Sequence, residues 1–322
     1  MKNKKSYYRA FSEVLKTEFG TKVYKIPLDV GFTCPNRDGS VSLGGCIYCD
    51  EAGSGPGQEK SSQSISLRLD LGKKVMQKRY KCEKYIAYFQ AFTGTYTKPE
   101  TLKAFFDEAL CDPDIIGLSV ATRPDCLAEE MIKMLEIYHK KTYLWIELGL
   151  QTANDEVLKK VNRGHTVACF IDAVERIKKR GMRVCAHFVI GLPGDDTEHL
   201  YRGAEIVGAQ GIDAVKLHHL YITKGAPIAS AWKKGFIKTM DLEEYARLAV
   251  DFLERIPQEV IIQRLFGSST KDKLLAPAWT LNRSQSQQAI VKEFIRRGTR
   301  QGYLYEKNIT NPNRHKENNI DA

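Results

Sequence analysis

The sequence predicts an α/β fold, namely a partial (β/α)6 barrel of the TIM type with a small basic C-terminal extension. Apolar runs alternate six times with amphipathic helical segments between residues 26 and 255, and the connections are short. Such alternation produces a parallel sheet, and right-handed crossovers curl it toward a barrel. Six units are too few to close an eight-stranded barrel, so we expect an open one. Chemically distinctive residues also gather after the strands, where such barrels place their active sites.

Composition bounds the class of protein. The 322 residues are 43% hydrophobic, enough to bury one large core. No apolar run reaches the ~18 residues of a membrane span, and no apolar leader follows the basic start of the chain. We therefore expect a cytoplasmic protein without membrane contact. The net charge of +10 fits a polyanionic partner such as RNA, and charge alone fits a merely basic soluble protein as well.

The elements follow in order. Residues 1–25 are expected to form an N-terminal amphipathic helix, with Phe11, Val14 and Leu15 on its apolar side. Strands are predicted at residues 26–32, 85–91, 115–121, 143–150, 183–190 and 214–221. Helices are predicted at residues 66–81, 99–110, 126–140, 155–161, 168–180, 197–209 and 242–255, and the first of these carries a basic face.

The composition changes after the barrel. Between residues 255 and 307 there are ten Lys or Arg and four Asp or Glu. Residues 259–265 are compatible with a further strand, and 285–300 with a helix that ends in arginines. We expect the barrel to span residues 26–255, a basic C-terminal domain to span 256–307, and the polar residues 308–322 to form a disordered tail.

Three cysteines, Cys34, Cys46 and Cys49, share the loop after the first predicted strand. Three close thiolates can hold a soft metal centre. A structural zinc ion needs four ligands, and the first histidine of the chain, His139, is far away in sequence. A 4Fe-4S cluster with one open iron needs only three, so we favour the cluster and keep zinc as the alternative. The other five cysteines are scattered, and we expect them to be inert buried thiols.

Several motifs after the strands carry a resemblance. They are Gly31-Phe-Thr-Cys-Pro-Asn-Arg-Asp-Gly39, Gly44-Gly-Cys46, Thr122-Arg-Pro-Asp125, Leu148-Gly-Leu-Gln151, Asn162-Arg-Gly-His-Thr166, Gly191-Leu-Pro-Gly194 and Trp232-Lys-Lys-Gly235. Together they resemble the radical S-adenosylmethionine (SAM) superfamily, in the branch related to the catalytic subunit of Elongator. Within that branch they are similar to the bacterial YtqA/YhcC subgroup. The resemblance covers about residues 20–305.

The resemblance implies a chemistry and a set of contacts. SAM would bind the open iron of the cluster, and one-electron cleavage would yield a radical that abstracts hydrogen from the substrate. The residues that it implies for SAM binding are Tyr48, Gln90, Thr93, Glu147, Gln151, Arg163, His187 and Gly191. Glu147 is expected to replace a carboxylate that relatives carry at the position of Ala121. The catalytic residues stay unknown, with Tyr221, Lys224 and His218 as candidates on the substrate side.

The resemblance to the subgroup also implies a substrate and partners. It points to the anticodon loop of tRNA, where wobble carboxymethylaminomethyl-(2-thio)uridine would become aminomethyl-(2-thio)uridine, with flavodoxin or ferredoxin as electron donor. A radical SAM oxidoreductase acting on a small metabolite is the first alternative. A non-catalytic, zinc-containing RNA-binding protein is the second. Salt-sensitive tRNA binding would favour the first hypothesis over the small metabolite.

Overall fold

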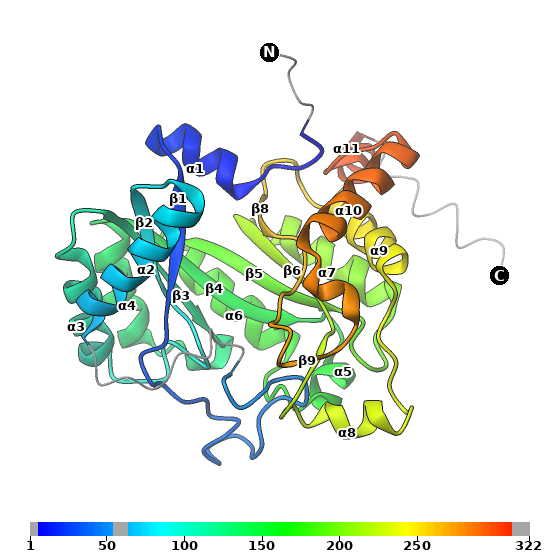
Figure 1. Cartoon of the computed structure of the whole chain (residues 1–322), viewed down its shortest axis with the longest axis horizontal. Coiled ribbons are helices and arrows are strands. Elements are labelled where there is room, and N and C mark those ends of the chain that lie inside the picture. The colour runs from blue at the N-terminus through cyan, green and yellow to red at the C-terminus, as the bar shows by residue number, and fades with distance from the viewer. Residues whose placement is uncertain (1–5, 54–63, 311–322) are drawn as a thin grey trace.

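A curled parallel sheet forms the centre of the molecule, seen here in a computed structural model that describes residues 6–53 and 64–310 (Figure 1). Its strand order is β1-β2-β3-β4-β5-β6-β8, and all neighbouring strands are parallel. The strands are β1 (Val23–Leu28), β2 (Lys84–Phe89), β3 (Ile115–Thr122), β4 (Tyr143–Gln151), β5 (Arg183–Ile190), β6 (Ala214–His219) and β8 (Ile261–Arg264). The predicted α/β partial barrel is confirmed.

Helices cover the outer face of the sheet. They are α2 (Ile65–Tyr80), α3 (Pro99–Leu110), α4 (Glu129–His139), α5 (Asp155–Lys160), α6 (Val167–Lys178), α7 (Thr197–Ala209) and α9 (Leu242–Arg255). Apolar side chains such as Phe106, Phe170 and Phe252 are fully buried between the two layers. The periodic apolar pattern therefore placed these helices within a few residues of their observed bounds.

The first strand ends earlier than the sequence indicates, at Leu28 rather than at residue 32. The carboxylate of Asp29 accepts a hydrogen bond from the backbone N–H of Gly31 at 3.0 Å, and Gly31 adopts a left-handed φ of 77°. This local bond offers the backbone an alternative to the sheet. The cysteine loop therefore starts from a turn, which carries the chain away from the sheet before Cys34.

The sheet has seven strands instead of the predicted six. Residues 261–264, expected to belong to an appended domain, form β8 and pair with β6, so that Lys216 lies opposite Arg264. The crossover through α9 brings this strand to the next position of the same sheet. The barrel sheet therefore extends past residue 255, and Arg264 ends one of its strands.

Smaller elements complete the C-terminal half. β7 (Ile222–Thr223) and β9 (Leu274–Ala276) form an antiparallel pair, and α8 (Ile228–Lys233) follows β7. Two short 3-10 helices span Pro124–Cys126 and Ala278–Leu281. α10 (Arg283–Arg297) packs on α9, and α11 (Tyr303–Thr310) follows it. Helix α11 includes residues 308–310 of the expected tail, and residues 311–322 lie outside the described residues.

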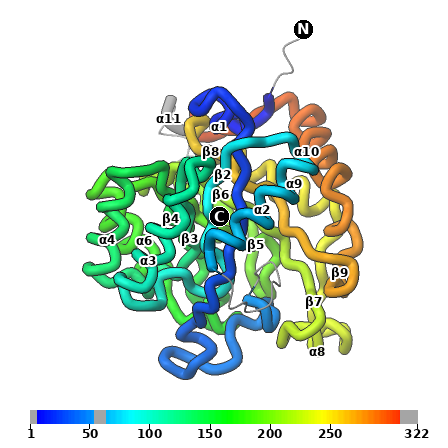
Figure 2. Tube along the Cα trace, turned by 60° about the vertical axis from the view of Figure 1, so that its left-hand side comes forward, coloured from blue at the N-terminus to red at the C-terminus, as the bar shows by residue number. Residues whose placement is uncertain are grey.

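The N-terminal segment lies at the end of the barrel opposite the cysteine loop (Figure 2). α1 (Phe11–Phe19) is shorter than the expected 1–25 because Gly20, with a φ of 70°, ends it. Just before α1, Ala10 forms an isolated parallel bridge with Ile262 of β8. Gln301 also binds this segment: its N–H donates to Tyr7 O and its side-chain oxygen accepts from Arg9 N–H, both at 2.9 Å. β1 and β8 are the two edge strands of the curled sheet, and a gap lies between them. These contacts close one end of that gap.

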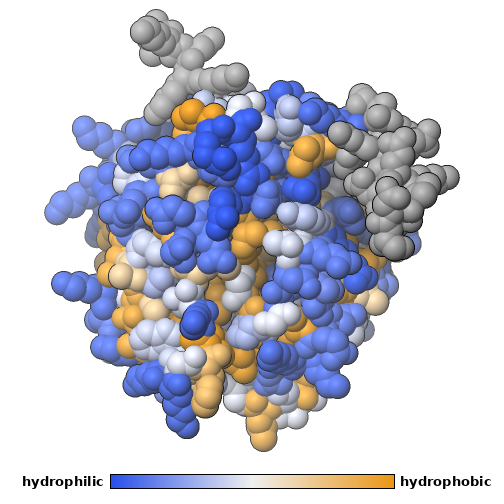
Figure 3. Space-filling view, turned by 90° about the vertical axis from the view of Figure 1, so that its right-hand side faces the viewer, coloured by the Kyte–Doolittle hydropathy of each residue, from blue (hydrophilic) through white to orange (hydrophobic). Residues whose placement is uncertain are grey.

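One face of the molecule shows how hydrophilic and apolar residues are distributed over its surface. The face that carries α9 and α10 is largely hydrophilic, with apolar side chains gathered mainly in its lower half (Figure 3). Within residues 6–53 and 64–310, no helix combines the length and the hydropathy needed to cross a membrane.

Candidate cofactor and active site

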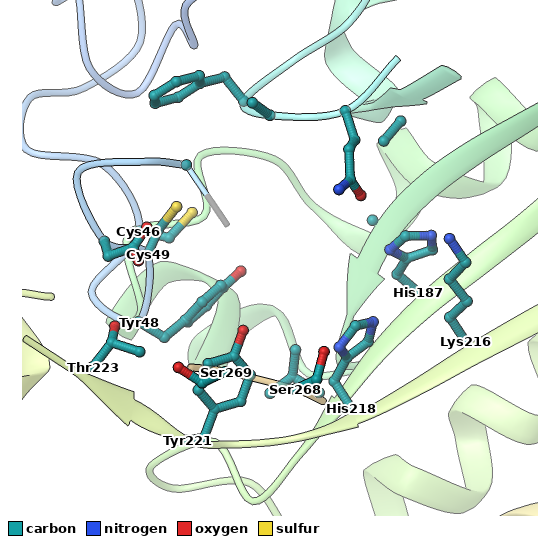
Figure 4. A pocket seen from close by; sticks show the side chains of 18 of the residues that line it. Cys46, Tyr48, Cys49, His187, Lys216, His218, Tyr221, Thr223, Ser268 and Ser269 are labelled. Carbon is teal, nitrogen blue, oxygen red and sulfur yellow. The ribbon is translucent and has the colours of Figure 1, made fainter. Parts of the chain in front are cut away.

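One cavity of about 820 Å³ opens at the C-terminal ends of the strands. Twelve of the fourteen residues singled out in the sequence line it, namely Cys34, Cys46, Tyr48, Cys49, Gln90, Thr93, Glu147, Gln151, Arg163, His187, His218 and Tyr221. Figure 4 shows Cys46 and Cys49 on one side of the open centre and His187, Lys216 and His218 on the other. The strand-end residues therefore converge on a single site, as expected for this class of barrel.

The remaining two residues lie elsewhere. Lys224 is exposed, and its backbone N–H donates to Lys273 O at 2.9 Å beside the β7–β9 pair. Gly191 has a φ of 90° in a tight turn, and a side-chain carbon there would come within 2.7 Å of Met240 Cε. Neither belongs to the cavity lining. The structure thus places Gly191 against Met240, and Lys224 on the surface.

The cysteine loop is held by backbone hydrogen bonds and by side chains from elsewhere in the barrel. Cys49 N–H donates to Cys46 O at 2.9 Å, which closes the turn of the Cys-x-x-Cys pair. The side-chain amide of Asn162 donates to Gly45 O at 2.8 Å and to Leu43 O at 3.1 Å. The long insert between Cys34 and Cys46 therefore docks on the turn after α5, which gives it a structural role in fixing the cysteines.

Two nitrogen donors approach the sulfur of Cys46. Asn36 Nδ2 lies 3.7 Å from Cys46 Sγ, and Arg163 Nη1 lies 3.8 Å from it. Arg163 is buried and also donates to Gly149 O at 3.0 Å and to His165 Nε2 at 2.8 Å. N–H donors at a ligating sulfur tune the electronics of a metal centre. Arg163 therefore supports the cysteine loop directly.

A second arginine fixes the backbone of the first. Arg123 is buried, and its guanidinium pairs with Asp125 at 2.7 Å while Nη1 donates to Arg163 O at 2.7 Å. Both Arg123 and Asp125 belong to the Thr-Arg-Pro-Asp motif that follows β3. The motif is thus a positioning element for the loop that faces Cys46.

Unpartnered polar atoms test whether the cavity suits a polar cofactor. Among the described residues, the buried hydroxyls of Tyr48 and Thr93 and the buried Nε2 of His218 have no hydrogen-bond partner. Leaving such an atom unpaired costs about 1–3 kcal/mol each. All three residues line the cavity, and Tyr48 lies between two of the cysteines. The residues present therefore fit a ligand rich in hydrogen-bonding groups, as SAM is.

A buried carboxylate organises the interior of the barrel next to the cavity. Glu147 on β4 has a fully buried side chain and forms ion pairs with Lys25 and Lys216. Its two oxygens also accept from Ser119 Oγ and Tyr88 OH, each at 2.7 Å. Because these partners occupy both oxygens, Glu147 serves the protein's own cations rather than standing free for the amino group of SAM.

The histidine next to this carboxylate is fixed in one tautomer. His187 Nε2 lies 2.8 Å from Glu147 Oε2, so it donates to the carboxylate and leaves Nδ1 as an acceptor. Burial lowers the pKa of His187 to about 4, against the opposing effect of the bond to Glu147. The imidazole is therefore neutral near pH 7.

The protonation of the ion-paired groups follows from burial and charge. Burial opposes ionisation of Glu147, but the nearby Lys216 and Lys25 hold its pKa well below the usual range. Burial lowers the pKa of Lys216 to about 7, and Glu147 only partly offsets this effect. Lys216 therefore lines the cavity as an amine that exchanges a proton near neutral pH.

Sequence reasoning missed the partners of Glu147. Lys25 and Lys216 stand inside otherwise apolar strands, as Glu147 does. Charged side chains are almost never fully buried unless they are paired. The isolated charges in three buried strands were therefore the signal that could have predicted the network.

Cations dominate the rest of the lining. Eight Lys or Arg residues and three Asp or Glu residues line the cavity. Four of these cations, Arg79, Arg264, Lys273 and Arg283, come from α2 and from the segment after β6. Such a set favours a polyanion at the mouth of the cavity.

Comparisons with known proteins bear on the family of the whole chain. The Radical SAM superfamily model matches residues 33–205, and the Radical_SAM C-terminal domain model matches residues 212–296. The chain is 37% identical to uncharacterized protein YtqA of Bacillus subtilis (strain 168) over 305 residues, 95% of each chain. It is 31% identical to a tRNA uridine(34) acetyltransferase of Methanocaldococcus jannaschii over 137 residues, 40% of this chain and 24% of that relative.

Among solved structures, the fold is similar to the archaeal Methanocaldococcus infernus Elp3 with an N-terminal deletion. The TM-score is 0.63 at 19% sequence identity, with coverage of 88% of this chain and 67% of that chain. At this identity the likeness concerns the fold alone.

Proposed function

Because the chain belongs to the radical SAM superfamily, a family that implies SAM and an iron–sulfur cluster, we propose that it is a tRNA-modifying enzyme of this class. Cys34, Cys46 and Cys49 hold a 4Fe-4S cluster, and the substrate is the wobble uridine. The reaction converts carboxymethylaminomethyl-(2-thio)uridine to aminomethyl-(2-thio)uridine: loss of a hydrogen atom and then of one electron, which returns to the cluster, gives an imine, and water cleaves its C–N bond to release the two carbons as glyoxylate. The observation that carries the proposal is one cavity with the cysteines on one side and a polar, cation-rich wall on the other.

The cofactors would supply the radical chemistry, and side chains of the protein would bind SAM. When bound, the reduced cluster and SAM supply a 5′-deoxyadenosyl radical that removes a hydrogen atom from the carbon beside the side-chain nitrogen. Tyr48, Thr93, Gln90 and Gln151 line the cavity and would hold SAM, and the unpartnered hydroxyls of the first two would meet its polar groups. A small redox protein such as flavodoxin or ferredoxin supplies the electron.

The tRNA assignment has support from charge and from a relative. The lining cations Arg79, Lys273 and Arg283 fit a phosphate backbone that lies across the opening. Bases of an anticodon loop are already unpaired, so inserting one into a deep cavity costs little. The similarity to a tRNA uridine(34) acetyltransferase supports the same nucleotide.

Gly149 offers a test of SAM binding that leaves the fold intact. A side-chain carbon at Gly149 would lie 2.2 Å from Gln151 Nε2 and 2.6 Å from Arg163 Nη2. Both are ends of long side chains, so Gly149→Ala should displace them at a cost of about 1–3 kcal/mol in the free energy of unfolding. We expect SAM affinity, measured by equilibrium dialysis on the reconstituted protein, to fall about tenfold. Unchanged affinity would remove these side chains from the SAM site.

The substrate is tested in cells. Nucleoside mass spectrometry of tRNA from a strain that lacks the gene should show carboxymethylaminomethyluridine accumulating and aminomethyluridine and its products disappearing. Complementation with the wild-type gene should reverse the change, whereas Cys46→Ala should not. An identical nucleoside profile in the wild-type strain and the strain that lacks the gene would contradict the tRNA assignment.

A further inference from the structure

Three residues that line the cavity lie side by side on neighbouring strands. Parallel pairing sets His187 of β5 opposite Lys216 of β6, and Lys216 opposite Arg264 of β8. Neighbouring strands are about 4.8 Å apart, so these positions form one row. His218 stands two residues beyond Lys216 and points to the same face. We call these four residues the cavity floor. Figure 4 shows three of them, His187, Lys216 and His218.

The charge of this region is unbalanced. Glu147 contacts the floor through His187 and Lys216, and both of its oxygens are engaged by protein donors. Lys25, Lys216 and Arg264 bring three basic groups to the same interior. The nearness of Arg264 lowers the pKa values of His187, Lys216 and His218 further, after the larger effect of burial. An additional anion would therefore be attracted to the floor.

Depth and shape select the kind of anion. Lys216 is only 4% exposed, and the unpartnered Nε2 of His218 is buried. Arg264 is exposed, as Arg79 and Arg283 are, but strand pairing sets Arg264 directly beside the buried Lys216. A small planar carboxylate can meet Arg264, Lys216 and His218 together, because the fork of an arginine pairs with it through two parallel hydrogen bonds.

We propose that the cavity floor is a carboxylate-binding subsite, in which Arg264, His218 and Lys216 hold an acid group of the substrate away from the cysteines. The inference deepens the proposed function and rests on it for the identity of the acid, the carboxymethyl group of the wobble nucleoside. Arg264 then selects substrates that still carry the acid and releases the product, which lacks it. Its role is binding and positioning.

The first experiment uses the reconstituted enzyme with SAM and an anticodon stem-loop RNA. The RNA carries either carboxymethylaminomethyluridine or its methyl ester at the wobble position. Wild type should turn over the acid with a kcat/KM roughly 10- to 100-fold above that of the ester. Arg264→Gln should lower the value for the acid to that of the ester and leave the ester unchanged, while Arg264→Lys should retain part of the preference. The exposed Arg202 of α7 provides a matched control, because Arg202→Gln should behave as wild type.

The second experiment needs no RNA. In calorimetric titration of the SAM-loaded enzyme, N-acetylglycine should bind saturably, its methyl ester should not, and Arg264→Gln should weaken binding roughly tenfold. Methyl phosphate binding as well as N-acetylglycine, or equal binding by wild type and Arg264→Gln, would overturn the subsite. Binding of N-acetylglycine without RNA turnover would refute the tRNA substrate but retain the subsite. Turnover of the acid and the ester RNA at equal rates would refute the subsite but retain the tRNA substrate.

Discussion

Cys46→Ala should yield a folded protein that contains less than about one iron per chain after anaerobic reconstitution, against about four in wild type. Cys46 is buried in the centre of its loop, with Asn36 and Arg163 directed at its sulfur. Removing it leaves two cysteines, too few to hold the cluster that we propose. Formation of 5′-deoxyadenosine should therefore fall below detection, measured by chromatography with dithionite as reductant.

A cysteine outside the cavity provides the control. Cys111 at the end of α3 is exposed, and its substitution by Ala should leave iron content and product formation at wild-type levels. If Cys46→Ala retained a full complement of iron, the assignment of the three-cysteine loop as the cluster site would be wrong.

Glu147→Ala is expected to be the most destabilising substitution in the barrel interior. It would leave Lys216, whose side chain is 5% exposed, and Lys25 without their shared counter-ion. Breaking a buried ion pair by removing one partner costs about 3–5 kcal/mol, and an exposed pair is worth about 0–1 kcal/mol. Urea denaturation should show this loss, and Asp172→Ala, which removes an exposed partner of Arg176, should show almost none. A cost for Glu147→Ala below about 1 kcal/mol would contradict the network.

Lys216 and Glu147, the two partners of that ion pair, should affect the stability of the protein in different pH ranges. The pKa of Lys216 is about 7 in the folded protein, below its ordinary 10.5, so the unfolded chain binds more protons between these values. The free energy of unfolding should therefore rise with pH across this window by up to about 1.4 kcal/mol per pH unit from this group. Glu147 acts at acidic pH. Its lowered pKa stabilises the folded protein, and this stabilisation is lost as pH falls below about 4.5.

Lys216→Met should remove the alkaline rise and weaken the acidic loss without abolishing it, because Lys25 still lowers the pKa of Glu147. Urea denaturation at pH 7, 8 and 9 on wild type and Lys216→Met measures the difference. Parallel curves for the two proteins over this range would show that Lys216 titrates at its ordinary value.

The fold was predictable because its signals are local. Apolar runs, helical periodicity and capping residues lie within each element, and both α3 and α7 have the predicted bounds. The bounds of β1 depended on a hydrogen bond between Asp29 and Gly31, and β8 is only four residues long. A run of four residues becomes a strand because it pairs with a neighbouring strand, and the hydrophobic periodicity of the run does not indicate that pairing.

The site was predictable where its chemistry is contiguous in sequence. The cysteine spacing identified the loop, and membership of the radical SAM superfamily is confirmed by the match over residues 33–205. The partners of Glu147 come instead from β1, β2, β3, β5 and β6, and only strand order and register bring them together. Arg264 escaped notice for the same reason, since its strand had been expected outside the barrel.

The attachment of Gln301 to the N-terminal segment has a consequence for how the chain folds during its synthesis. Its partner Arg9 lies 292 positions earlier, so these hydrogen bonds can form only after residue 301 has left the ribosome. The first residues have no docking site on β8 until residues 261–264 are made, and none on Gln301 until later still. Closure of the β1–β8 gap is therefore one of the last steps of folding, and the cysteine loop is complete well before it.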